Sequence, residues 1–128
     1  MKITVLKILE QYEEEFIISF FSEQGAAVAR WNGDVPILNG VYFVEVEIPD
    51  VLNWGTDVIK AVATQFSIKN EDGFTILVGK LESSYDDGCY DIRFGHSIVT
   101  LELKGEPYPL ETYLQIRTKN IILYDIGF

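Results

Sequence analysis

Cysteine and histidine are nearly absent from this chain of 128 residues. Cys89 is the only cysteine, so no disulfide can form within the chain and a disulfide-stabilised scaffold is excluded. His96 is the only histidine, and one Cys with one His cannot complete a closed zinc site without two carboxylates. The glycines are isolated turn or bulge residues and form no phosphate-binding loop. The sequence therefore predicts neither a metal nor a cofactor.

Long apolar runs and an excess of basic side chains are also missing. No run approaches bilayer length, and Lys7 and Glu10 interrupt the first residues, which resemble a strand more than a signal peptide. Twenty acidic against ten basic residues give a net charge of −10, which repels phosphate backbones and anionic membrane surfaces. We therefore expect a soluble, cytoplasmic protein that binds neither nucleic acid nor membrane.

The negative charge is concentrated in the first part of the chain. Up to Asp57 there are three basic and ten acidic residues, a balance of −7, whereas the remainder has seven and ten, a balance of −3. A strongly acidic surface attracts a basic partner and speeds their encounter. Any electrostatic recognition surface should therefore involve the first part, and a basic protein is the partner that it favours.

Residues that favour β-structure are abundant, and turn signals separate them into short segments. Val, Ile, Phe, Tyr and Thr dominate the segments, while Asn32-Gly33, Asn39-Gly40 and Asp72-Gly73 are typical of tight turns. The segments that we expect to be strands are 1–10, 16–21, 26–31, 41–48, 74–81, 89–94, 97–103, 113–117 and 121–124.

The apolar pattern also indicates which faces of some strands are buried. Residues 41–48 alternate, which predicts a half-buried strand with Glu45 and Glu47 on its outer face. Residues 16–21 are almost continuously apolar, which favours a strand buried on both faces. Residues 56–68 fit both a helical and a strand spacing, and their content of Val, Thr and Phe favours a strand.

These features predict an all-β protein. We expect a single domain over residues 1–128, built as an antiparallel barrel or a barrel-like sandwich of about nine short strands. At most one short helix is expected, near residues 51–66. Hydrophobic residues make up 48% of the chain, which is enough to form a substantial core.

The residues with catalytic potential do not form a recognisable set. The His96 imidazole could act as a general base, but the adjacent Ser97 would point to the opposite face of a strand. Cys89 could face His96 across a hairpin, yet the aspartates near it in the sequence should raise its pKa and make it unreactive. Those aspartates also lack the spacing of a calcium-binding loop; they are Asp86, Asp87 and Asp91. We therefore do not expect an enzyme.

The remaining functional candidates are acidic residues and tryptophans that lie beside turns. Aromatic side chains near turns can anchor a partner, and surrounding carboxylates suit a basic one. The candidate binding residues are Glu13, Glu14, Glu15, Trp31, Glu45, Glu47 and Trp54. They predict a non-catalytic protein that recognises a basic protein through an acidic, aromatic-bearing face, an immunity or inhibitor protein being one form.

Two alternatives remain open for the function. A β-barrel can hold a small apolar ligand in its interior, and an acidic β-protein can serve as a structural subunit of a larger assembly. The subunit would be joined through an edge strand such as residues 1–10. The sequence identifies no particular partner and gives no oligomeric state.

Overall fold

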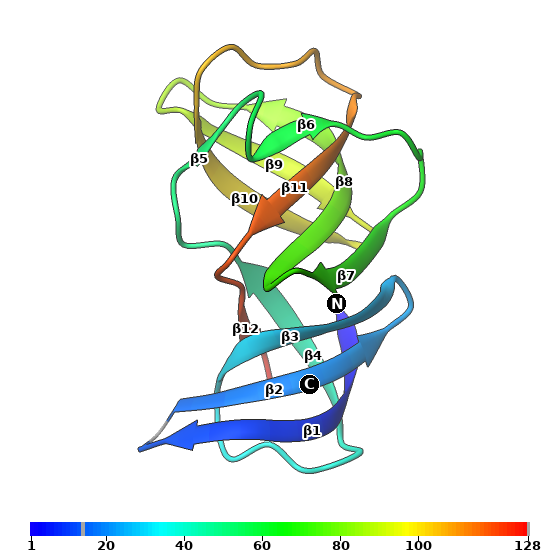
Figure 1. The fold of residues 1–128 in the computed structure, drawn as a ribbon, viewed down its shortest axis with the longest axis vertical. Helices are drawn as coiled ribbons and strands as arrows, with labels where there is room; N and C mark the ends of the chain where they lie inside the picture. Colours follow the sequence, from blue (N-terminus) through cyan, green and yellow to red (C-terminus); the bar gives the residue numbers. More distant parts are fainter. Residues whose placement is uncertain (14, 128) are drawn as a thin grey trace.

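The computed structural model describes residues 1–13 and 15–127 and consists of β-strands, turns and loops, with no helix among them. This confirms the predicted all-β class, with twelve strands in place of about nine (Figure 1). The strands are β1 (Lys2–Tyr12), β2 (Glu15–Ser22), β3 (Gly25–Asn32), β4 (Val41–Glu47), β5 (Leu52–Asn53), β6 (Val58–Lys60), β7 (Ser67–Glu71), β8 (Phe74–Ser84), β9 (Cys89–Phe94), β10 (Ser97–Lys104), β11 (Tyr113–Thr118) and β12 (Ile122–Asp125).

The first sheet is a closed five-stranded barrel with the order β1-β2-β3-β12-β4. β1, β2 and β3 follow one another as antiparallel neighbours, and β4 pairs with the start of β1. β12 lies between β3 and β4, parallel to the former and antiparallel to the latter. The last strand of the chain therefore completes a barrel that the first four strands begin, seen in the lower half of Figure 1.

The second sheet contains the seven remaining strands, in the upper half of Figure 1. Its order is β5-β10-β9-β8-β11-β6, and β7 pairs with β8 outside this path. A bridge between Trp54, which follows β5, and Val58 of β6 joins the two ends of the order. The second sheet thus also curves round towards closure.

Specific polar contacts join the two sheets. The Ile68 N–H on β7 donates to the Gln24 carbonyl oxygen before β3, at 3.0 Å. The Val28 N–H on β3 donates to Asn70 Oδ1 on β7, at 2.7 Å. A cluster of buried apolar side chains contains residues of both sheets. β3 and β7 are therefore the elements that fix one sheet against the other.

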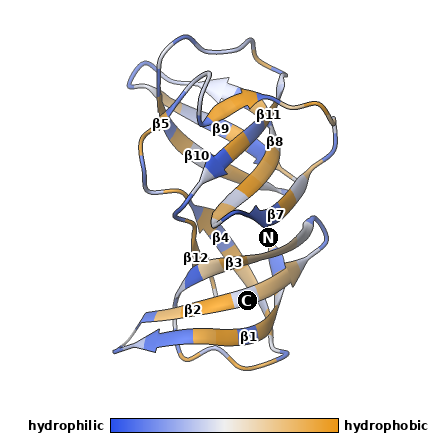
Figure 2. Ribbon diagram, viewed as in Figure 1, coloured by the Kyte–Doolittle hydropathy of each residue, from blue (hydrophilic) through white to orange (hydrophobic). Residues whose placement is uncertain are grey.

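Barrel closure explains where the predicted burial pattern is right and where it is wrong. On β4, Val44 and Val46 are buried and Glu45 and Glu47 are exposed, as the alternation predicted. On β2, by contrast, Phe21 is 54% exposed, so the prediction of burial on both faces is wrong. A strand of a closed barrel has one face towards the interior and one outside, so alternate residues of the apolar run of β2 lie on the outer face. Figure 2 shows the hydrophobic colouring along this strand.

The ambiguous segment 56–68 forms neither one strand nor a helix. β6 ends at Lys60, a loop follows, and β7 begins at Ser67. β6 is short because it pairs with β11 over only three residues, and Val62 beyond it is fully exposed. The apolar spacing in this segment therefore reflects no continuous buried face. Splitting it, together with the short β5, accounts for the additional strands.

Candidate functional site

The outer surface of β3, β12 and β4 brings together side chains from three distant parts of the sequence. Opposed residues on neighbouring strands share one face of a sheet. The register pairs Tyr124 with Glu45 on β4 and with Asn32 on β3. It likewise pairs Ile122 with Glu47 and with Arg30. Tyr124 therefore lies between an acidic row on β4 and a polar row on β3.

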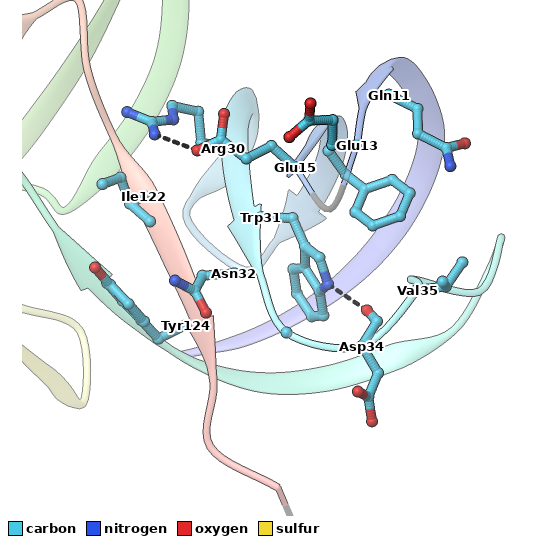
Figure 3. Close-up of a pocket in the computed structure, with 12 residues that line it drawn as sticks. Gln11, Glu13, Glu15, Arg30, Trp31, Asn32, Asp34, Val35, Ile122 and Tyr124 are labelled. Atoms are coloured by element: carbon cyan, nitrogen blue, oxygen red, sulfur yellow. Dashed lines mark hydrogen bonds and ion pairs between the residues drawn. The ribbon is translucent and has the colours of Figure 1, made fainter.

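A pocket of about 690 Å³ opens beside β3, and we call it the β3 groove (Figure 3). Carboxylates of Glu13, Glu15 and Asp34 line it together with Trp31 and Tyr124. In Figure 3 the Trp31 indole points towards Asp34, and its Nε1–H donates to the Asp34 carbonyl oxygen at 2.7 Å. This bond fixes the loop after β3 at the side of the groove.

A second pocket, of about 620 Å³, lies between the two sheets, and we call it the β4–β10 groove. Glu45 and Glu47 line one side from β4, and Thr100 of β10 lines another. Tyr124 lines this groove as well as the β3 groove, so the two grooves adjoin at its side chain. Because they share this lining residue, we call the two pockets together the joined grooves.

Negative charge predominates in the joined grooves. The lining carboxylates are Glu13, Glu15, Asp34, Glu45 and Glu47. The basic groups that also line them are the Arg30 guanidinium, the Met1 amino group and the His96 imidazole. Arg30 forms an ion pair with Glu15 at 2.8 Å, and the Met1 amino group donates to the Val44 carbonyl oxygen. Burial lowers the pKa of the Met1 amino group, while Glu45 acts in the opposite direction. The grooves therefore keep a local excess of carboxylate charge.

Tyr124 is electrostatically coupled to the acidic row. Hydrogen bonding to Glu47 raises the pKa of Tyr124, and burial adds to this effect. The phenol therefore stays protonated as a hydrogen-bond donor at the point where the grooves meet. Sequence reasoning missed Tyr124, because nothing in residues 121–124 indicates that this strand inserts between β3 and β4.

The two tryptophans are buried, so the expectation of exposed aromatic anchors is wrong. Trp31 is 3% exposed and Trp54 is 8% exposed. Trp31 borders the β3 groove but packs edge-on against Tyr42, because it shares the inner face of β3 with Ala27 and Ala29. Trp54 belongs to the second sheet, where it packs against two tyrosines, at ring-centroid distances of 5.1 and 5.6 Å.

The acidic candidates are placed differently from the tryptophans. Glu13 and Glu15 are exposed and line the β3 groove, while Glu45 and Glu47 are exposed and line the adjoining one. Glu14 lies outside the residues that the structure describes. Four acidic candidates thus line two grooves that share Tyr124 as a lining residue, although they stem from two separate stretches of sequence.

His96 and Cys89 lie at opposite ends of the β9–β10 hairpin. His96 is exposed in its turn, whereas Cys89 pairs with Glu102 at the open end, six residues or about 20 Å along the strands. The hypothesis that they face each other is therefore wrong. Burial and then Asp87 raise the pKa of the Cys89 thiol, in the direction that the sequence predicted.

The aspartates near Cys89 form turn and cross-strand contacts. Asp87 Oδ1 accepts the Cys89 N–H at 3.1 Å, as expected for a turn. Asp91 accepts the Tyr85 hydroxyl and the Thr100 hydroxyl, each at 2.7 Å. Within residues 1–13 and 15–127, no group of three or more His, Cys, Asp or Glu side chains is arranged to hold a metal ion.

Comparison with family models, with curated proteins and with solved structures found no match to this chain. In the part of the chain that the structure describes, no helix is long and apolar enough to cross a membrane.

Proposed function

We propose that this protein binds a basic protein through the joined β3 and β4–β10 grooves. The proposal retains the acidic surface that the sequence indicated and gives up the exposed tryptophans. An immunity or inhibitor role towards a basic protein is the form that suits this chemistry, since such a protein needs to bind and not to react.

The observation that carries the proposal is the lining of two grooves, which share Tyr124, by five acidic residues. Glu45 and Glu47 are exposed on one strand and lie next to a groove lined by Glu13, Glu15 and Asp34. A concave surface with one sign of charge concentrates the field and steers an oppositely charged partner into it. Lysine and arginine side chains, which can donate hydrogen bonds to several carboxylates at once, match this lining.

The extent of the surface favours a protein over a single small cation. Two adjoining grooves, of about 690 and 620 Å³, are lined by acidic residues of β2, β4, the β1–β2 turn and the loop after β3. A small cation would satisfy only part of this lining, whereas a basic protein surface can place several side chains along both grooves. An acidic lining of this kind repels nucleic acid phosphates.

Charge reversal on β4 tests the proposal. The double variant Glu45→Lys/Glu47→Lys changes the net charge from −10 to −6, and the matched control Asp86→Lys/Glu106→Lys makes the same change. Asp86 and Glu106 are exposed in loops of the second sheet and line neither groove. Binding of oligolysine and of a small basic protein is measured by calorimetry, with oligoglutamate as the negative probe.

We expect the groove variant to weaken binding about tenfold or more, and the loop variant to change it by about twofold or less. Equal losses in both variants would show that only net charge matters and would overturn the proposal. Amide chemical shifts during titration provide the second readout, with perturbations expected at residues lining the two grooves. Perturbations confined to the second sheet would place binding elsewhere.

A further inference from the structure

The second half of β1 is exposed on both of its faces. From Leu6 to Tyr12 seven consecutive residues are exposed, whereas Ile3 and Val5 before them are buried. We call residues 6–12 the β1 arm. Its four large apolar side chains are Leu6, Ile8, Leu9 and Tyr12, with 44, 36, 48 and 69% exposure. Figure 2 shows the apolar colouring of β1 before its polar end.

Apolar exposure is concentrated round this arm. Among residues 1–13 and 15–127, seventeen large hydrophobic residues are exposed, and ten of them lie within the first 43 residues of the chain. The loop after β3 adds Val35, Ile37 and Leu38, and it is bonded to β1 through Val5. Exposed apolar side chains on β1 and on the loop bonded to it favour an interaction surface in this part of the molecule.

One edge of the β1 arm has no strand beside it. β2 pairs along the other edge from Thr4 to Tyr12, while β4 pairs only with Lys2–Thr4. Val5 bonds to Asn39 and Gly40 of the loop, and beyond it no described strand pairs with this edge. In Figure 1 the β1–β2 hairpin extends past the neighbouring strand β3. The edge therefore offers unpaired backbone groups to a further strand.

The charges of the arm are self-complementary. Lys7 and Glu10 flank Ile8-Leu9 symmetrically, and they make the arm neutral in a molecule of net charge −10. Lys7 and Glu10 share one face of β1 because Leu9 is the extra residue of a bulge, and their partners on β2 are Ser19 and Ile17. Two antiparallel copies related by a twofold axis near Ile8 therefore bring Lys7 of each beside Glu10 of the other. Neither residue belongs to an ion pair among the described residues, so both charges are available. A lysine on an edge strand normally prevents pairing with another chain, but here Glu10 of the second copy would neutralise the charge of Lys7.

We propose that the β1 arm joins this chain to a second copy of itself. The two arms pair antiparallel along their free edges, and the exposed apolar side chains pack at the twofold axis. Register shifts on both sides of Lys7-Ile8 leave Leu6 and Leu9 without direct partners on β2. These bulges turn the two leucines outward, where the second copy covers them. Gln11 of the arm also lines the β3 groove, but the arm does not include Glu45 or Glu47, so the proposed dimer goes beyond the binding of a basic protein.

Sedimentation equilibrium of the whole chain and its charge variants tests the proposal. We expect a concentration-dependent dimer whose dissociation constant rises about tenfold in Lys7→Glu and in Glu10→Lys, because each change puts like charges opposite each other. The exchanged variant Lys7→Glu/Glu10→Lys should dimerise within about twofold of the original. A mixture of the two single variants should form a heterodimer, since their arms carry opposite charges.

The design separates local pairing from overall repulsion. Lys7→Glu changes the net charge from −10 to −12 and Glu10→Lys changes it to −8, so overall charge alone would shift dimerisation in opposite directions. A monomer at all concentrations, a dimer indifferent to these changes, or opposite effects of the two variants would each overturn the proposal. The Glu45→Lys/Glu47→Lys variant should still dimerise, and loss of its dimer would assign the interface to the grooves instead.

Discussion

Glu47 is coupled electrostatically to Tyr124 within the candidate site. They stem from strands separated by more than half of the chain, yet β12 and β4 are direct neighbours in the first barrel. Hydrogen bonding to Glu47 is the largest cause of the raised pKa of Tyr124. A phenol whose pKa is higher in the folded than in the unfolded state stabilises the fold below about pH 10. That stabilisation is lost as the pH rises through the folded-state value.

Replacing Glu47 should therefore lower the pKa of Tyr124. We expect Glu47→Gln to move the phenol titration towards its ordinary value, because the charged acceptor and its repulsion of the phenolate are both removed. NMR of isotope-labelled tyrosine follows each ring separately, and Tyr124→Phe identifies the signal. Glu45→Gln is the matched control: it faces Tyr124 in the register but does not contribute to the shift. A titration curve unchanged by Glu47→Gln would contradict the coupling.

Gly25 allows the backbones of β3 and β7 to approach each other closely. Its φ is +139°, and a Cβ built there would lie 2.2 Å from the Ile68 carbonyl oxygen. The backbone must approach this closely because the Ile68 N–H bonds to Gln24 directly before it. Only glycine allows this approach and this backbone conformation together.

An alanine at Gly25 should destabilise the fold more than an alanine at Gly73. Gly73 also has a positive φ, +80°, but a Cβ there meets nothing within 4 Å. Gly73→Ala should thus lower the free energy of unfolding by the conformational cost alone, about 1–2 kcal/mol. Gly25→Ala should lower it by about 1–3 kcal/mol more, because the added Cβ also clashes with the Ile68 carbonyl oxygen. Urea unfolding measures both. Equal losses of unfolding free energy in the two variants would contradict a close backbone contact between β3 and β7 at Gly25.

The whole molecule consists of two curved sheets that share buried side chains. Trp31 belongs to the interior of the first barrel and Trp54 to the second sheet, and both occur in one buried cluster. Hydrogen bonds between β3 and β7 cross the junction. Shared burial of this kind couples the unfolding of adjoining parts.

The two sheets should unfold together, as the single domain that the sequence predicts. Trp31→Phe leaves Trp54 as a fluorescent reporter of the second sheet, and Trp54→Phe leaves Trp31 as a reporter of the first. In each variant, we expect the urea midpoint of fluorescence to coincide with that of far-ultraviolet circular dichroism. Separate midpoints would show two independently stable units, whichever sheet melts first.

Local patterns in the sequence were enough to predict some features of the fold and the site. The alternation of β4 placed Glu45 and Glu47 outside, and turn residues such as Asp72-Gly73 marked the ends of strands. These predictions succeeded because side-chain alternation and turn conformation depend on neighbours in the chain. Charge counting likewise directed attention to the first part of the chain, which carries most of the groove carboxylates.

Other features depended on which strands meet, and only the tertiary structure decided them. Trp31 lies directly before a turn signal, yet its side chain faces the interior of the barrel. On β2, Phe21 is exposed and Ile17 and Ser19 are only half-buried, because the outer face of the strand lies towards solvent. Tyr124 joined the site because β12 inserts between β3 and β4. Strand order and barrel closure arise from contacts between residues far apart in the sequence. The spacing of apolar residues within one segment therefore does not predict them.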